Sequence, residues 1–122
     1  MNRIAVIEDE QDLRVTYDRL LRRAGYRVVT AGSRAEGLNL FRGAAPSLVI
    51  LDLKLPDGDG LDILRAARAL DPPVPVIVVT AFATRATREA VVTAGAAALL
   101  PKPFVASALL RLVRDELDPI TR

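Results

Sequence analysis

The sequence predicts an α/β fold, with a mainly parallel sheet and helices on both of its faces. Five short stretches rich in aliphatic residues alternate with five segments in which apolar residues recur at helical spacing. Strict alternation of strand and helix is typical of a parallel sheet, because each crossover between parallel strands needs a helix-length connection. Polar or turn-forming residues follow each aliphatic stretch, so the ends of the predicted strands are well marked.

The predicted strands are short. Residues 48–51 give the strongest signal, since four aliphatic residues in a row indicate a strand that is buried on both faces. This strand ends at Asp52, and a turn rich in Pro, Asp and Gly follows directly. The five strands are expected at residues 3–7, 26–31, 48–51, 76–79 and 98–100.

The predicted helices have start and stop signals. Ser33 is expected to be an N-cap, with Glu36 three residues later as its capping-box partner. Glycine and proline supply most of the stop signals. The helices are expected at about residues 13–24, 34–42, 61–70, 84–94 and 105–117, and they end at Gly25, Gly43, Pro72, Gly95 and Pro119.

Length and composition limit the classes of protein to which this chain can belong. The 122 residues fit one domain, expected to cover residues 1–122, whose last residues are either the end of the protein or a linker stub cut from a longer one. A hydrophobic content of 51% excludes a disordered chain. The sequence has no apolar run of roughly 20 residues and no signal-peptide pattern, so we expect no membrane contact and a cytoplasmic location.

Charge and residue types narrow the chemistry. The net charge is only +2 and the arginines are scattered, which argues against direct nucleic-acid binding. There is no cysteine and no histidine, so thiolate chemistry and imidazole metal ligands are excluded. Any chemistry must use carboxylates, hydroxyls, lysine, arginine and the backbone.

Polar side chains stand at the ends of four predicted strands. They are Glu8 and Asp9 after the first strand, Asp52 on the third, Thr80 on the fourth and Lys102 after the fifth. Ligands bind at this edge of open parallel sheets. Two carboxylates about 4 Å apart repel by roughly 4 kcal/mol at an effective dielectric near 20, and Mg²⁺ would relieve this because it prefers oxygen ligands. An incoming phosphoryl group would then be held by Lys102 and Thr80 while Asp52 attacks phosphorus.

In the order and spacing of these residues, the chain resembles the receiver domains of two-component response regulators (CheY-like). The resemblance covers essentially the whole chain. It is carried by the segments Val6-Ile7-Glu8-Asp9-Glu10, Leu51-Asp52-Leu53-Lys54-Leu55-Pro56-Asp57-Gly58-Asp59-Gly60, Val79-Thr80-Ala81 and Leu100-Pro101-Lys102-Pro103-Phe104. It implies a flavodoxin-like, doubly wound, three-layer sandwich with strand order 2-1-3-4-5 and five helices.

The resemblance also implies a role for each matched residue. Asp52 would be the phosphoacceptor. Asp9, Asp52 and the carbonyl of Lys54 would be Mg²⁺ ligands, and Glu8 would act mainly through water on the ion.

Two further matched residues would act on the phosphoryl group. Thr80 would bind a phosphoryl oxygen and relocate on activation, and Lys102 would pair with the phosphate. In this family the peptide bond before Pro103 is usually cis.

One departure from the family bears on signalling. Leu99 stands three residues before the lysine, where the family commonly has an aromatic residue that turns inward on activation. Ala97 and Ala98 replace the acidic pair of the branch that forms a salt-bridged dimer, which argues against that dimer although a homodimer of another kind stays open.

The expected function is therefore a phosphorelay receiver, which is a signalling switch and not a turnover enzyme. It would accept a phosphoryl group from a sensor histidine kinase or phosphotransfer protein. It would then control an output domain or downstream protein through the surface formed by residues 84–94, 98–100 and 105–117. The alternative is a pseudo-receiver, an interaction module that works without phosphorylation and is suggested only by Leu99.

The remaining acidic residues and motifs of the chain have simpler interpretations. Asp57 and Asp59 are assigned to the turn, and Glu10 to the favourable N-terminus of a helix. An EF-hand loop counted from Asp57 fails because Asp62 stands where Gly is required. A dinucleotide fingerprint fails at Ile63, and a haloacid-dehalogenase-type phosphatase would need an acid at Lys54.

Overall fold

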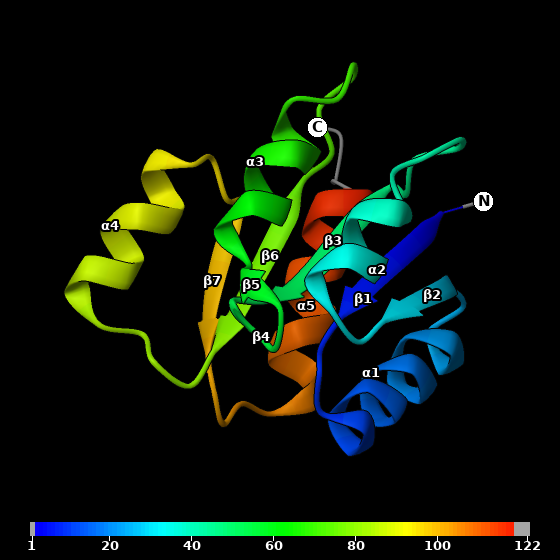
Figure 1. Cartoon of the computed structure of the whole chain (residues 1–122). Helices are drawn as coiled ribbons and strands as arrows, with labels where there is room; N and C mark the ends of the chain where they lie inside the picture. Colours follow the sequence, from blue (N-terminus) through cyan, green and yellow to red (C-terminus); the bar gives the residue numbers. More distant parts are fainter. Residues whose placement is uncertain (1, 119–122) are drawn as a thin grey trace, which may run out of the picture.

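The aliphatic stretches form the predicted parallel sheet. The computed structural model describes residues 2–118, and its main sheet has the order β2-β1-β3-β6-β7 with every neighbouring pair parallel (Figure 1). Counted along the chain without the small hairpin described below, this is the order 2-1-3-4-5, so the predicted fold is confirmed. The strands are β1 (Arg3–Ile7), β2 (Arg27–Ala31), β3 (Leu48–Asp52), β6 (Val76–Thr80) and β7 (Ala98–Pro101).

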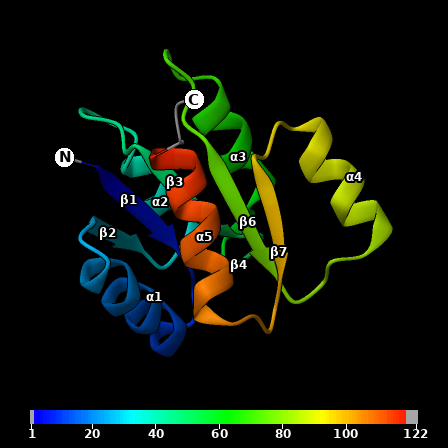
Figure 2. The ribbon, with the colours of Figure 1, turned by 180° about the vertical axis from the view of Figure 1, so that it is seen from behind.

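Helices cover both faces of the sheet, as Figures 1 and 2 show from opposite sides. Along β1, Ile4 and Val6 belong to the apolar cluster on one face, whereas Ala5 and Ile7 belong to the cluster on the other. This alternation is what a strand buried on both faces requires. One face is covered by α1 (Gln11–Arg23) and α5 (Ala106–Leu117), and the other by α2 (Arg34–Asn39), α3 (Leu61–Arg68) and α4 (Arg85–Thr93).

Local signals fix most helix ends. The Ser33 hydroxyl accepts a hydrogen bond from the backbone N–H of Glu36 (3.1 Å), as the N-cap prediction requires. The Glu36 carboxylate accepts from the N–H of Gly32 (3.0 Å), one residue before the N-cap. Gly25 (φ 98°) and Gly95 (φ 93°) follow α1 and α4 in the left-handed conformation that glycine adopts without strain. Pro119, the expected stop after α5, lies outside the described residues.

Apart from shifts of one or two residues at element ends, the structure differs from the prediction in two places. Helix α2 ends at Asn39 and not near residue 42, because the N–H groups of Phe41 and Arg42 bond three residues back, in a tighter turn than an α-helix. The segment expected only to turn after Asp52 contains a small antiparallel hairpin, formed by β4 (Lys54–Leu55) and β5 (Gly58–Asp59). Within residues 2–118, no helix combines the length and apolar character that a membrane crossing needs.

Candidate phosphoryl-acceptor site

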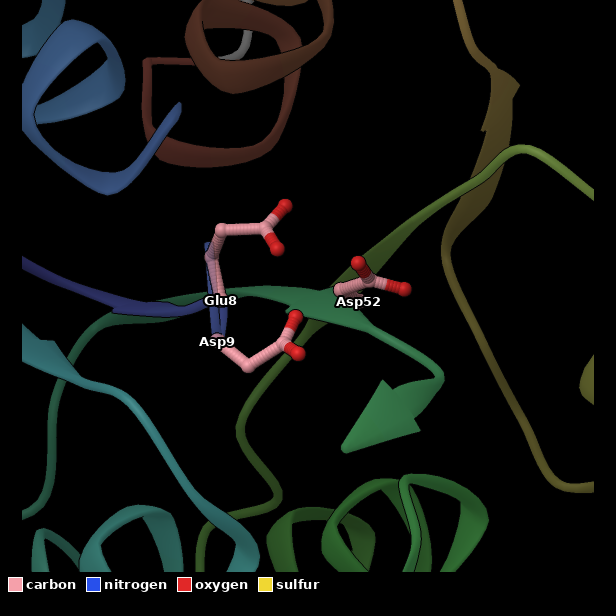
Figure 3. A group of neighbouring side chains, drawn as sticks. All are labelled: Glu8, Asp9 and Asp52. Atoms are coloured by element: carbon pink, nitrogen blue, oxygen red, sulfur yellow. The ribbon is translucent and has the colours of Figure 1, made fainter. Parts of the chain in front are cut away.

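The strand register brings the predicted site residues to one edge of the sheet. Ile7 of β1 pairs with Leu51 of β3, so the next residues, Glu8 and Asp52, lie side by side where these two strands end. Figure 3 shows Glu8, Asp9 and Asp52 together at the ends of these two strands. The site is therefore assembled by strands that are neighbours in space but about 40 residues apart in sequence, as the parallel order predicts.

Three carboxylates form one cluster at this edge. Glu8, Asp9 and Asp52 each have an oxygen within 4.8 Å of an oxygen of the other two. Glu8 is only 1% exposed and Asp52 only 7% exposed, whereas Asp9 is exposed to solvent. Two buried carboxylates and one exposed carboxylate give a negative site that opens to solvent on one side.

Lys102 reaches into this cluster from the loop after β7. Its Nζ atom donates to Glu8 Oε1 (2.8 Å) and to Asp52 Oδ2 (3.0 Å). The backbone holds it there, since the Lys102 N–H donates to the carbonyl of Thr80 (2.8 Å) at the end of β6. The peptide bond before Pro103 is cis, as the family resemblance implied. One ammonium group thus bridges the two buried carboxylates.

Burial and pairing shift the protonation equilibria in this site. Burial raises the pKa of Glu8 to about 7, and the negative charge of Asp52 adds to the rise, while the hydrogen bond from Lys102 opposes it. Burial alone would lower the pKa of Lys102, but its hydrogen bonds to Glu8 and Asp52 outweigh this and raise it above its ordinary value. The site therefore holds Lys102 as a cation at neutral pH.

The other two predicted residues lie beside Asp52. The backbone N–H of Lys54 donates to Asp52 Oδ1 (3.0 Å), and the Lys54 ammonium lies 4.2 Å from the centre of the Phe82 ring. Thr80 is 3% exposed, and its hydroxyl accepts from the N–H of Phe82 (3.0 Å). Thr80, Lys54 and Phe82 all line a pocket of about 420 Å³, which also borders Leu61 of α3.

The donor set suits a hard divalent cation. All three carboxylates offer oxygen ligands, and there is no nitrogen or sulfur ligand in the cluster. When fully ionised, the three carboxylates and the Lys102 ammonium carry a net charge of −2, which one Mg²⁺ would neutralise. Mg²⁺ prefers carboxylate and water oxygens and keeps several waters, so the exposed side at Asp9 fits it. The residues present therefore fit the predicted ion.

Asp57 and Asp59, assigned to the turn, do more than turn the chain. The Asp57 carboxylate accepts from the N–H groups of Arg34 (2.6 Å) and Ala35 (2.9 Å), the first two residues of α2. Asp59 accepts from the N–H of Leu61 (2.9 Å), the first residue of α3. The spacing of Asp59 before a helix is a visible sequence signal, but Asp57 caps a helix more than 20 residues earlier, which no local pattern indicates.

Leu99, the departure from the family pattern, is partly buried. It lies on the edge strand β7 and packs against the apolar cluster on the face covered by α2, α3 and α4. The structure therefore has an aliphatic side chain where an aromatic switch residue would stand.

Comparison with known proteins agrees with this architecture. The response regulator receiver domain family matches residues 4–114 of the chain. The transcriptional regulatory protein PrrA of Mycobacterium tuberculosis is 37% identical over 112 residues, which cover 92% of this chain and 48% of PrrA. The chain thus spans about half the length of the curated relatives it matches.

Two solved structures show the same fold. The non-phosphorylated HemR receiver domain of Leptospira biflexa has a TM-score of 0.90 and 34% identity, and the match covers 100% of this chain and 98% of HemR. A response regulator of Burkholderia pseudomallei, solved with a phosphorylated aspartic acid and a calcium ion, has a TM-score of 0.85 and 29% identity, covering 92% of this chain and 66% of that one.

The chain belongs to the response regulator receiver domain family. It is a receiver domain of the kind used in two-component signalling, and the pseudo-receiver alternative is not favoured, because the acidic cluster and Lys102 are present together.

Proposed function

We propose that Asp52 is the phosphoacceptor and that the domain is a switch controlled by the phosphorylation of this residue. The observation that carries the proposal is the bridge from Lys102 Nζ to Asp52 Oδ2 (3.0 Å) and Glu8 Oε1 (2.8 Å), within a cluster of three carboxylates. The bridge holds a cation beside the oxygen that would attack phosphorus. The phosphorylated aspartic acid reported for the Burkholderia pseudomallei relative supports the same chemistry here.

The chain's own residues would divide the work of phosphoryl transfer. An oxygen of Asp52 forms a bond to phosphorus as the bond between phosphorus and the donor atom breaks, and no proton has to leave the ionised carboxylate. The Lys102 ammonium and the Thr80 hydroxyl would each hold a phosphoryl oxygen. The N–H of Lys54, which donates to Asp52 Oδ1, would orient the carboxylate and leave Oδ2, the oxygen beside Lys102, to attack phosphorus.

The proposed metal ligands are Asp9, Asp52 and the backbone carbonyl of Lys54, with Glu8 acting through water. When bound, Mg²⁺ would offset the negative charge that the phosphoryl group brings to the acidic cluster. The calcium ion in the Burkholderia pseudomallei relative supports a divalent cation at such a site.

The proposed partners follow from the family. A sensor histidine kinase or a phosphotransfer protein would supply the phosphoryl group, and the surface of α4, β7 and α5 would pass the signal to an output domain or a separate protein. PrrA, which is about twice as long as its match, supports the interpretation that residues 1–122 are one receiver domain that acts on another module. The cytoplasmic location stays a prediction.

The experiment is phosphorylation by a small phosphodonor. Wild-type protein incubated with Mg²⁺ and acetyl phosphate should gain the mass of one phosphoryl group, and Asp52→Asn should gain none. Asp59→Asn is the matched control, because Asp59 is an exposed carboxylate of the hairpin that follows Asp52, and its substitution should leave uptake intact. No mass gain in the wild type, or an equal gain in Asp52→Asn, would refute the proposal.

A further inference from the structure

Arg14 of α1 reaches back to the loop that carries two of the three clustered carboxylates. Its Nη1 atom donates to the carbonyl of Glu8 (2.8 Å), and a longer contact joins it to the carbonyl of Asp9 (3.4 Å). Both contacts are made to the backbone and not to the carboxylates. They therefore act on the positions from which the Glu8 and Asp9 side chains start.

This loop has few other means of support. The pairing of β1 with its neighbours ends at Ile7, and the N–H of Glu8 makes one further bond, to the carbonyl of Ala31 (3.0 Å). Helix α1 then begins at Gln11 without a side-chain cap at Glu10. The guanidinium of Arg14 spans this gap between the end of the strand and the start of the helix.

Gly32 provides the space that this contact needs. A Cβ atom at Gly32 would lie only 2.7 Å from Arg14 Nη1 and 3.4 Å from Arg14 Cζ, so any other residue would displace the guanidinium. Gly32 directly follows Ala31, the residue whose carbonyl binds the N–H of Glu8. The guanidinium of the half-buried Arg14 thus lies between the end of β2 and the loop after β1.

We propose that Arg14 is a positioning residue for the divalent cation. It would clamp the backbone of Glu8 and Asp9 so that their carboxylates converge with Asp52, and Gly32 would leave the space in which the guanidinium lies. This inference rests on the proposed function, because it assumes that the cation binds at the acidic cluster. Groups that orient metal ligands commonly change metal affinity by about 10- to 100-fold when they are removed.

The direction in which Mg²⁺ affinity changes when Arg14 is removed distinguishes a positioning role from a purely electrostatic one. As a positive charge near the cluster, Arg14 repels a cation, so its removal would strengthen binding if charge were its only contribution. As a clamp, its removal weakens binding because the carboxylates lose their common orientation. Gly32→Ala makes the separation sharper, since it displaces the guanidinium without removing the charge.

The test is a Mg²⁺ titration of the full chain by calorimetry or by NMR. We expect Arg14→Met to weaken Mg²⁺ binding by roughly 10-fold, because its side chain donates to neither carbonyl. Arg14→Lys should lose less, because an ammonium can donate to two acceptors as one guanidinium nitrogen does here. Gly32→Ala should weaken binding in the same direction, and the double variant Gly32→Ala/Arg14→Met should be no weaker than Arg14→Met. Arg22→Met is the matched control: Arg22 lies on the same helix and donates to a carbonyl, that of Val28 (2.9 Å), outside this loop.

Hydrogen exchange of the Glu10 amide gives a second readout, which can be measured without metal. The N–H of Glu10 donates to the Glu8 carboxylate (3.2 Å), so its hydrogen exchange reports how well the loop is held. Exchange of this amide should be faster in Arg14→Met and Gly32→Ala than in wild type, and unchanged in Arg22→Met.

The results that would overturn the inference are specific. Unchanged or tighter Mg²⁺ binding in Arg14→Met, or an equal loss in Arg22→Met, would show that Arg14 does not position the ligands. If the wild type itself binds no Mg²⁺, the proposed function fails instead. In that case unchanged Glu10 exchange in Arg14→Met would still refute the clamp, and faster exchange would support it.

Discussion

At the scale of single residues, Lys102 places one ammonium group between the two buried carboxylates of the site. Its ammonium lies 2.8 Å from a Glu8 oxygen and 3.0 Å from an Asp52 oxygen, and its side chain is 17% exposed. A cation at this position holds two buried carboxylates together that would otherwise repel each other. The same group would meet a phosphoryl oxygen once Asp52 is modified.

The substitution Lys102→Met tests both roles. Phosphorylation by acetyl phosphate should slow by about 10- to 100-fold, since a hydrogen bond to a charged group contributes about 1.5–3 kcal/mol and each 1.4 kcal/mol or so is a factor of ten. Mg²⁺ affinity should stay equal or rise, because a competing cation is gone. Rates would be followed by mass spectrometry and Mg²⁺ binding by calorimetry.

The matched control is Lys54→Met. Lys54 is the only other lysine of the sequence, and its ammonium faces the Phe82 ring instead of the carboxylates. The Lys54→Met variant should therefore be phosphorylated at a rate within a few-fold of the wild-type rate. Much weaker Mg²⁺ binding in Lys102→Met would contradict the view that the Lys102 ammonium competes with Mg²⁺ for the carboxylates. It would show instead that the ammonium helps to hold the metal ligands in place.

At the scale of secondary structure elements, the hairpin and α2 are joined by a cap that comes from another part of the chain. Asp57 binds the first two N–H groups of α2, while Ser33 binds the N–H of Glu36 as the local N-cap. Two oxygens from Asp57 and one from Ser33 therefore satisfy three of the free N–H groups that begin any helix. A helix of only six residues depends on such contacts, because short helices are marginal alone.

This cap predicts a pH dependence of stability. The hydrogen bonds from Ala35 and Arg34 lower the pKa of Asp57 below its ordinary 3.8. A carboxyl group whose pKa is lowered by folding stabilises the folded state above its unfolded pKa, and this contribution is lost as the pH falls through the folded pKa. The cap should thus be fully effective above about pH 5 and should fade below about pH 4.

The measurement is urea unfolding of wild type and Asp57→Ala across this range. Asp57→Ala should be less stable than wild type at neutral pH, and the difference should shrink below about pH 4. Asp115→Ala, at an exposed position of α5, controls for the loss of one carboxylate. A difference that stays constant down to the acid end of the range would show that the charge of Asp57 contributes nothing to the cap.

At the scale of the whole molecule, the apolar interior and the polar site are separated along the strands. The five strands fill both faces with aliphatic side chains, and the buried polar residues Glu8, Asp52 and Thr80 stand only at the carboxyl edge. The site therefore lies along the carboxyl edge of the sheet. A ligand bound there would contact residues of β1 and β3 and, through Lys102, the loop after β7. Binding there should stabilise the entire fold.

Mg²⁺ should accordingly raise the free energy of unfolding of the wild type, by about 2.7 kcal/mol at a concentration 100 times its Kd. Asp9→Asn should lose most of this gain. Because the substitution removes one of three clustered carboxylates, the metal-free protein should be at least as stable as the wild type. Thermal unfolding with Mg²⁺ or with a chelator measures both effects. An undiminished Mg²⁺ effect in Asp9→Asn would mean that the ion binds elsewhere.

The sequence by itself determined the alternation of strands and helices and the polar residues at the ends of four of the five strands. Those features depend on local patterns, namely aliphatic runs such as residues 48–51 and stop signals such as Gly25 and Gly95. Because carboxyl ends of parallel strands meet at one edge, the same patterns also indicated that Glu8, Asp52 and Lys102 would come together.

Only the tertiary structure decided which atoms meet. It placed Lys102 between Glu8 and Asp52, Asp57 on the first turn of α2, and the Arg14 guanidinium over the glycine at position 32. In each case the packing of separate elements brings the two partners together. In two of the three cases the partners are more than 20 positions apart in the sequence. Hydrogen bonds require distances near 3 Å and fixed directions, and a residue pattern specifies neither until the elements have packed.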